Sequence, residues 1–227
     1  MSILEAAVGW LAPPQCVGCG LEGWALCSSC STSGILPYGE RCGFCECLSP
    51  GGRTCPSCRV VGAPRFVWIT ATHEGLSQEL VQAYKFGHLR AAAPAIAGLM
   101  AQTFASSNPA DTGYLVVPLP TATGHARQRG FDHSALLARL MARRLRLPYA
   151  PALGRLGQVQ QVGASRQVRL SQQRDQFFSR QPHRVSGQNI LLVDDVITTG
   201  GSLLAASRVL RAAGAAHVDA LVFTKRL

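Results

Sequence analysis

The chain has 227 residues, of which 47% are hydrophobic and 15% charged, enough to bury the core of one medium-sized domain beside a small module. Aromatic residues make up only 7%, which is low for a surface that stacks many bases, and no apolar segment is long enough to span a membrane. The net charge of +10 is uneven: residues 1–112 carry six Lys and Arg against seven Asp and Glu, whereas residues 113–227 carry sixteen against five. A basic second half suits a surface that meets phosphate groups, although any single arginine is better explained as a solvated helix-face charge.

The N-terminal stretch 3–14 is apolar, but it is short, lacks a basic start and contains Glu5. These features argue against a secretory signal. We therefore expect a cytoplasmic protein.

Residues 16–58 contain all nine cysteines, and eight of these form four Cys-x-x-Cys pairs. The pairs are Cys16 and Cys19, Cys27 and Cys30, Cys42 and Cys45, and Cys55 and Cys58. Each pair can clamp one face of a tetrahedral ion, and two pairs complete a Cys₄ site, so the spacing predicts two structural zinc sites. A disulfide framework would leave an odd thiol in a chain without a signal peptide, and a redox role more often uses a single pair.

The pairs can share zinc sequentially or as a cross-brace, and we favour the sequential arrangement, with Cys47 as a spectator. A closed Cys₄ site has no open coordination position. We therefore expect the sites to contribute folding energy or a docking surface rather than catalysis.

Gly62-Ala63-Pro64 predicts a boundary between a module at 1–62 and a larger domain at 63–227. The larger domain alternates strand and helix patterns. We expect strands over 65–72, 114–119, 190–193 and 217–224, and helices over 76–84, 91–104, 131–145 and 203–213. Residues 160–178 are weakly patterned and suggest a loop with a helix, and 181–188 is expected to be a linker.

Two places before residue 131 carry cations suited to phosphate. Lys85 ends the first helix, where it is either a solvated helix end or a point charge aimed at a phosphate. The loop 121–130 contains Arg127 and Arg129 among glycines and has no apolar periodicity. Because arginine forks bind phosphate oxygens in a bidentate manner, this loop suits a second and more highly charged anion.

The stretch 189–203 carries the strongest functional signal. An apolar strand with β-branched residues, typical of a parallel sheet, leads into Asp194 and Asp195, and a helix follows. The turn between them is Thr198, Thr199, Gly200, Gly201 and Ser202. Such a turn cradles an anion with backbone N–H groups, and we expect positive φ at both glycines.

The two carboxylates identify the anion. They would repel a bare phosphate but can accept hydrogen bonds from ribose hydroxyls, so a sugar phosphate with Mg²⁺ satisfies the whole site. Competing motifs fail, because no lysine lies near Gly200 and the Gly-x-Gly-x-x-Gly match at 18–23 lies inside the cysteine cluster. A solvated strand end is the simpler explanation of an acidic pair alone, but not of this combination.

Residues 193–202 resemble the signature of type I phosphoribosyltransferases, which bind phosphoribosyl pyrophosphate (PRPP). The resemblance implies a doubly wound, mostly parallel α/β sheet. It also implies that Asp194 and Asp195 hold the ribose 2′- and 3′-hydroxyls, and that residues 198–202 hold the 5′-phosphate.

The order of features over nearly the whole chain is similar to the ComF family of competence-associated, phosphoribosyltransferase-like proteins. The shared features are the cysteine module, Tyr84-Lys85-Phe86-Gly87, 117–120, 127–131 and 161–166. The chain departs from the family at Asp132-His133, where Asn-Gln is usual, at Val162, which replaces a common Thr, and at Gln172, near which Asn is usual. The resemblance implies transfer of phosphoribosyl to an unidentified nitrogen acceptor, with Arg129 and Lys85 offsetting the charge of pyrophosphate.

A second hypothesis is a DNA-uptake accessory protein that binds single-stranded DNA through its basic second half and zinc module, and keeps the PRPP site as a sensor or relic. The scarcity of aromatic residues argues against it.

Overall fold

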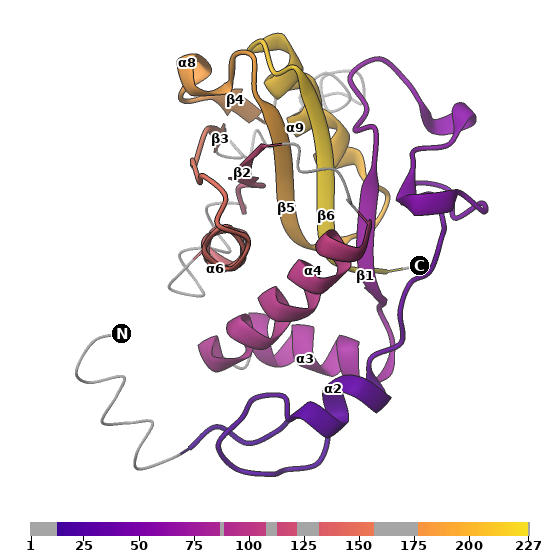
Figure 1. The fold of residues 1–227 in the computed structure, drawn as a ribbon, viewed down its shortest axis with the longest axis vertical. Coiled ribbons are helices and arrows are strands. Elements are labelled where there is room, and N and C mark those ends of the chain that lie inside the picture. The colour runs from indigo at the N-terminus through magenta and orange to yellow at the C-terminus, as the bar shows by residue number, and fades with distance from the viewer. Residues whose placement is uncertain (1–12, 87–88, 108–112, 122–131, 157–176, 227) are drawn as a thin grey trace, which may run out of the picture.

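A computed structural model of the chain describes residues 13–86, 89–107, 113–121, 132–156 and 177–226 (Figure 1). The helices and strands are α2 (Ser28–Gly34), β1 (Val67–Thr72), α3 (Gly75–Lys85), α4 (Ala93–Ser107), β2 (Tyr114–Pro118), α6 (His133–Leu145), β3 (Leu153–Arg155), β4 (Phe177–Ser179), α8 (Pro182–Val185), β5 (Asn189–Ile197), α9 (Gly201–Ala212) and β6 (His217–Lys225). Three 3₁₀ turns lie at Pro50–Gly52, Pro56–Cys58 and Arg90–Ala92.

The larger domain is built on a four-stranded parallel sheet in the described part of the chain. Its strand order is β1-β6-β5-β2, and all three neighbouring pairs run parallel. Most residues of β5 and β6 are buried on both faces, because residues alternate between the two sides of a pleated strand and both sides are covered. This arrangement confirms the parallel sheet that the unbroken apolar run 190–193 predicts.

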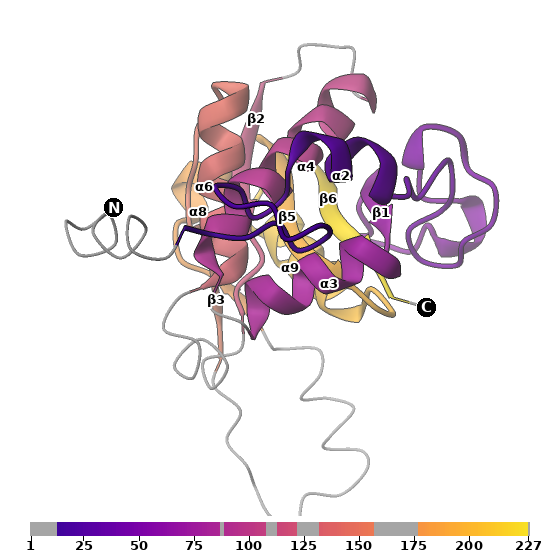
Figure 2. The same ribbon diagram turned by 90° about the horizontal axis from the view of Figure 1, so that it is seen from below.

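Helices cover both faces of the sheet, which makes the fold doubly wound (Figures 1 and 2). On one face, α3, α4 and α6 pack against Leu191, Val193 and Leu221. On the other face, α9 packs against Ile190 and Leu192 with the β3–β4 ribbon. The fold class expected from the family resemblance is therefore confirmed.

The cysteine module runs along the outer edge of β1, which both views show (Figures 1 and 2). Single β-bridges join Pro37 to Ala71 and Arg53 to Phe66, and the backbone N–H of Thr72 donates to the carbonyl of Leu36 at 3.0 Å. These bonds satisfy polar groups on what is otherwise the exposed edge of the sheet.

The structure differs from the expected elements in three places. Strand β5 continues to Ile197, because Val196 and Ile197 still pair with β6, so the two acids lie within the strand. The expected linker 181–188 contains the single-turn helix α8, and Phe177–Ser179 pairs with Leu153–Arg155 as an antiparallel ribbon. The remaining expectation for 160–178, a loop with a helix, lies outside the described residues up to 176.

The described residues contain no helix that is both long and apolar enough to cross a membrane.

Candidate functional site

The loop from Thr198 to Ser202, called the phosphate loop below, joins β5 to the N-terminus of α9. Gly200 is buried, adopts φ 78° and is the N-cap residue of the helix, as expected of a glycine at a left-handed position. Gly201 is the first helical residue and is absent from the described glycines with positive φ, so the expectation for that residue is wrong.

The first turn of α9 leaves its backbone donors available. Its N-cap is a glycine, and no side chain caps the helix within the described residues. Thr198, Thr199 and Ser202 are exposed beside these donors. Backbone N–H groups at a helix N-terminus, flanked by hydroxyls, favour an anion such as a phosphate.

Asp195 pairs with Lys85, whose position at the end of α3 left two interpretations open. The Lys85 Nζ lies 2.7 Å from Asp195 Oδ1, and both side chains are largely buried. Lys85 is therefore not a solvated helix end. The fold brings an ammonium group and the acidic pair together at the carboxyl end of β5.

Asp194 has different partners. Its Oδ1 accepts hydrogen bonds from Ser134 Oγ at 2.8 Å and from the backbone N–H of Asp195 at 2.9 Å. Desolvation, followed by the adjacent charge of Asp195, raises the pKa of Asp194 to about 7, and Lys85 and Ser134 partly oppose this rise. The Asp194 carboxyl is therefore only partly ionised at neutral pH without ligand.

A reciprocal contact between α3 and α6 sets the positions of Lys85 and Ser134. The Tyr84 hydroxyl donates to the carbonyl of His133 at 2.8 Å, and the His133 ring Nε2 lies 3.1 Å from the carbonyl oxygen of Tyr84. The two rings also meet edge to face at 4.7 Å. Each residue of this pair directly precedes one of the two residues that contact the acids.

The two residues that depart from the family pattern, Asp132 and His133, each make a structural contact at the start of α6. Asp132 is the N-cap of α6 and accepts from the backbone N–H of Ala135 at 3.0 Å. His133 is buried against Tyr84. Sequence reasoning did not identify Ser134, although its position in the first turn of the helix after an arginine-rich loop was a signal for it.

A cavity of about 460 Å³ opens where the carboxyl ends of β1 and β6 face the cysteine module. Its lining includes Pro37, Tyr38, Arg41, Glu46, Thr72, His73, Glu74, Gln78, Lys225 and Arg226. The Tyr38 hydroxyl and Thr72 Oγ1 are buried without a hydrogen-bond partner in the described structure. Burial and the charge of Glu46 raise the pKa of Tyr38 to about 12, so its hydroxyl remains a donor.

His73 lines the cavity and has a perturbed pKa. Burial lowers the pKa of His73, the charges of Arg226 and Lys85 lower it further, and Asp195 opposes them. His73 is held by Thr224, whose Oγ1 lies 2.9 Å from its Nδ1. The lowered pKa of His73 favours a neutral imidazole in the lining of the cavity.

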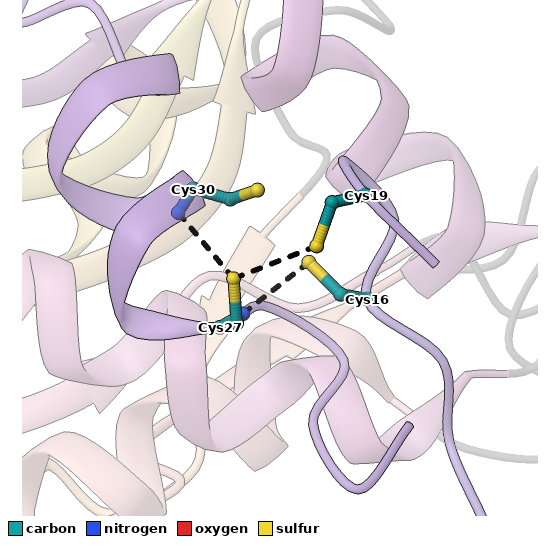
Figure 3. A group of neighbouring side chains, drawn as sticks. All are labelled: Cys16, Cys19, Cys27 and Cys30. Carbon is teal, nitrogen blue, oxygen red and sulfur yellow. Dashed lines mark hydrogen bonds between the residues drawn. The ribbon is translucent and has the colours of Figure 1, made fainter. Parts of the chain in front are cut away.

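The cysteines form two groups of four, and the pairs combine sequentially rather than as a cross-brace. The first cluster is Cys16, Cys19, Cys27 and Cys30 (Figure 3), and the second is Cys42, Cys45, Cys55 and Cys58. Within each cluster the sulfurs lie within 4.8 Å of one another, and all are free thiols. Cys47 is outside the second cluster, although its sulfur lies 3.5 Å from that of Cys45.

Both clusters fit structural zinc. Tetrahedral coordination with Zn–S bonds of about 2.3 Å separates neighbouring sulfurs by about 3.8 Å. The Cys19 and Cys27 sulfurs are 3.7 Å apart, and the Cys45 and Cys55 sulfurs are 3.5 Å apart. In the first cluster, the backbone N–H of Cys27 also points at Cys16 Sγ at 3.3 Å, a contact that favours the thiolate (Figure 3).

Arg127 and Arg129, the residues expected to meet pyrophosphate, lie outside the described residues. The same holds for the segment 161–172 that resembles the ComF family. The structure thus brings together Lys85, the acidic pair and the start of the phosphate loop.

Comparison with known proteins agrees with this geometry. Residues 132–227 match the family model described as a phosphoribosyl transferase domain. The chain is 29% identical over 145 residues to competence protein ComFC of Bacillus subtilis (strain 168), an alignment that covers 64% of this chain and 58% of that protein. The chain thus matches less than two thirds of that relative's length.

Three solved structures share weaker similarity. One is described as the allosteric regulatory enzyme of purine biosynthesis (TM-score 0.42, 20% identity, covering 58% of this chain and 26% of that one). Another is the glutamine PRPP amidotransferase from B. subtilis with ADP and GMP (TM-score 0.41, 20% identity, 57% and 26%). A third is TT1426 from Thermus thermophilus (TM-score 0.36, 16% identity, 59% and 83%).

Proposed function

We propose that this chain is a phosphoribosyltransferase-like protein of the ComF family, which binds PRPP with Mg²⁺ and transfers the phosphoribosyl group to a nitrogen acceptor. The contact between Lys85 Nζ and Asp195 Oδ1 is the observation that carries the proposal. It puts a cation for polyphosphate and acceptors for ribose hydroxyls side by side, next to a loop with unpaired amides.

Each part of the ligand has a suitable partner. The backbone N–H groups and hydroxyls of 198–202 take the 5′-phosphate, and the free oxygens of Asp194 and Asp195 accept from the ribose hydroxyls. Lys85, together with Arg127 and Arg129, neutralises the pyrophosphate. When bound with PRPP, Mg²⁺ supplies further neutralisation of the pyrophosphate oxygens.

The reaction exchanges one bond at the ribose C1′. The bond from C1′ to a pyrophosphate oxygen breaks, a bond from C1′ to the acceptor nitrogen forms, and pyrophosphate leaves with the electron pair. The nitrogen then loses a proton. The protein contributes mainly by holding the two partners in line and by stabilising charge that moves onto pyrophosphate.

We place the acceptor in the cavity between the cysteine module and the ends of β1 and β6. Its support is the position of the cavity at the ends of β1 and β6, where Lys225 pairs with Ile197 directly before the phosphate loop. The buried hydroxyls of Tyr38 and Thr72, which have no partner in the described part of the chain, are a second support. Buried hydroxyls without a partner favour a ligand with polar edges, because such a ligand satisfies them.

Calorimetric titration of the zinc-loaded protein with PRPP and Mg²⁺ tests the proposal. We expect the wild type to bind, and Asp195→Asn to weaken binding by at least tenfold, because the substitution removes the charge that Lys85 and the ribose hydroxyls share. Glu79→Gln is the matched control, since Glu79 is exposed on the same helix as Lys85. Wild-type affinity in Asp195→Asn would contradict this ligand position.

Pyrophosphate release with purine bases, pyrimidine bases and ammonia, measured on the same samples, tests transfer. Release with one of these acceptors, lost in Asp195→Asn, supports the enzyme. If PRPP binds but none of these acceptors causes release of pyrophosphate, the protein binds PRPP without transferring the phosphoribosyl group to them.

Single-stranded DNA binding is the second candidate function. Arg139, Arg143, Arg144 and Arg146 are exposed along and just after α6, which favours a polyanion. Salt-dependent oligonucleotide binding that persists in Asp194→Ala and Asp195→Ala, without pyrophosphate release, would favour this accessory role in DNA uptake. We place either activity in the cytoplasm, because the free thiols of both clusters require a reducing compartment.

A further inference from the structure

The ring of Phe44 lies directly against the phosphate loop. Phe44 belongs to the segment Cys42-Gly43-Phe44-Cys45, the 42–45 knuckle, which supplies half of the second cysteine cluster. A methyl group built on Gly200 would lie 2.6 Å from both Cδ1 and Cε1 of Phe44. Gly200 is the buried N-cap of α9, and the ring occupies the space into which a side chain at position 200 would project.

Hydrogen bonds from the end of β6 attach the 42–45 knuckle to the sheet. Lys225, which is 3% exposed, donates from Nζ to the carbonyl oxygens of Gly43 at 2.9 Å and Phe44 at 3.2 Å. Its Nζ also lies 3.4 Å from a carboxylate oxygen of Glu46. Lys225 pairs in register with Ile197, the last residue of β5 before the phosphate loop.

The backbone of the 42–45 knuckle packs closely against β1. A methyl group on Gly43 would lie 2.5 Å from Val67 Cγ1, so the backbone of the knuckle rests on β1. One end of the knuckle is thus tied to the sheet, and the cysteines on either side of it are the ligands that would hold zinc.

We infer that Phe44 is a positioning residue for the phosphate loop, and that zinc in the second cluster sets the affinity of this protein for a sugar 5′-phosphate. The identity of the ligand in this inference rests on the proposed function. The contact between Phe44 and Gly200 does not depend on that function. A metal-loaded knuckle holds the ring against Gly200, so the loop amides are ordered before the phosphate arrives. An empty cluster releases the knuckle, and the phosphate must then order the loop itself.

The first cluster provides an internal control. It packs against α3, where the side chain of Leu76 lies against Gly18 and Gly34, and its Cys16 and Cys27 belong to the core on the face of the sheet that α9 does not cover. Cys19 and Cys45 are both exposed and are the second cysteines of their pairs. Cys45→Ser and Cys19→Ser therefore impair one zinc site each, and only the former is linked to the phosphate loop.

Amide hydrogen exchange of the full-length, ligand-free protein tests the contact without any ligand. Phe44→Ala should raise the exchange rate of the Leu204 amide, which donates to the carbonyl oxygen of Gly200 at 2.9 Å, by at least tenfold, whereas Phe44→Leu should restore most of its protection. Leu48→Ala is the control for loss of an apolar side chain in the same module, because Leu48 is 82% exposed. Equal exchange in Phe44→Ala and the wild type would overturn the inference.

Titration with two partial ligands separates positioning from general destabilisation. Phe44→Ala and Cys45→Ser should weaken binding of ribose 5-phosphate by at least tenfold while affinity for Mg²⁺-pyrophosphate stays unchanged, and Cys19→Ser should bind both like the wild type. The inference would be overturned if Cys19→Ser and Cys45→Ser lost the same affinity for ribose 5-phosphate. It would also be overturned if Phe44→Ala or Cys45→Ser lost affinity for both ligands in parallel. If the wild type binds neither ligand, the proposed function fails and hydrogen exchange alone decides whether Phe44 positions the loop.

Discussion

At the residue scale, Asp194 shows how function and stability oppose each other in this site. Its carboxyl group lies in a strand end where desolvation and Asp195 both disfavour its charged form, so the pKa of Asp194 rises to about 7. A carboxyl group on the surface could ionise at neutral pH without this loss of folding free energy. The residue is better suited to accept a ligand hydroxyl than to stabilise the ligand-free fold.

We predict that Asp194→Asn stabilises the ligand-free protein at pH 8. Between about pH 4 and pH 7 the folded protein retains a proton that the unfolded chain has released, so the free energy of unfolding falls as the pH rises, by up to about 1.4 kcal/mol per unit for this group. Asparagine keeps the oxygen that accepts from Ser134 and from the backbone of Asp195 but cannot ionise. The variant should gain on the order of 2 kcal/mol at pH 8.

Urea unfolding at pH 5 and pH 8 measures this effect. The gain of Asp194→Asn should shrink at pH 5, and Glu79→Gln should show no gain at either pH. A gain that is the same at both values would mean that the carboxyl is not protonated in the folded protein.

At the element scale, β6 carries one buried charge near each end, and the two serve different purposes. Lys225 lies at the carboxyl end beside the 42–45 knuckle, whereas Asp219 lies nearer the amino end and is fully buried. Asp219 accepts from Arg65 Nε at 3.1 Å and Nη2 at 2.5 Å, from the backbone N–H of Phe66 at 3.2 Å, and from the Tyr114 hydroxyl at 2.7 Å. This network ties β1 and β2 to β6 at the end of the sheet away from the candidate site.

We predict that Asp219→Ala destabilises the protein by about 3–5 kcal/mol, because it leaves buried donors and a half-buried guanidinium without their acceptor. Tyr114→Phe, which removes one donor and keeps the ring, should cost only about 1 kcal/mol. Denaturant unfolding gives both values. Comparable costs for the two variants would show that the carboxylate does not hold the network together.

At the scale of the whole molecule, the cysteine module is continuous with the larger domain in its packing. Cys16, Ala25, Leu26 and Cys27 belong to the same buried cluster as α3 and α4, whereas Tyr38 belongs to the cluster on the other face of the sheet. The first cysteine cluster therefore packs on the face covered by α3 and α4, whereas the 42–45 knuckle packs through Phe44 on the other face.

We predict that removing zinc lowers the thermal stability of the larger domain as well as that of the module. Freshly purified protein should contain about two zinc ions per chain, and a chelator should release them and lower Tm by at least several degrees. Elemental analysis and calorimetry on the same sample test this. An unchanged Tm after complete loss of zinc would show that the contacts of the module with the sheet suffice without metal.

Local sequence patterns predicted most of the elements and the centre of the site. The apolar run 190–193, the glycine turn after it and the stripe of the following helix all depend on neighbours within a few residues. The misplaced features have long-range causes instead. The strand continues through the two acids because Val196 and Ile197 find partners on β6, and the β3–β4 ribbon joins segments separated by more than twenty residues.

The sequence by itself determined that this chain has an α/β domain with a sugar-phosphate signature and four cysteine pairs, because spacing and periodicity are properties of contiguous residues. Only the tertiary structure decided that Lys85 pairs with Asp195, that Ser134 donates to Asp194 and that Phe44 rests on Gly200. Each of these contacts joins residues on separate elements, and the packing of helices and module against a shared sheet brings them together. Long-range packing depends on the whole chain, and no local pattern encodes it.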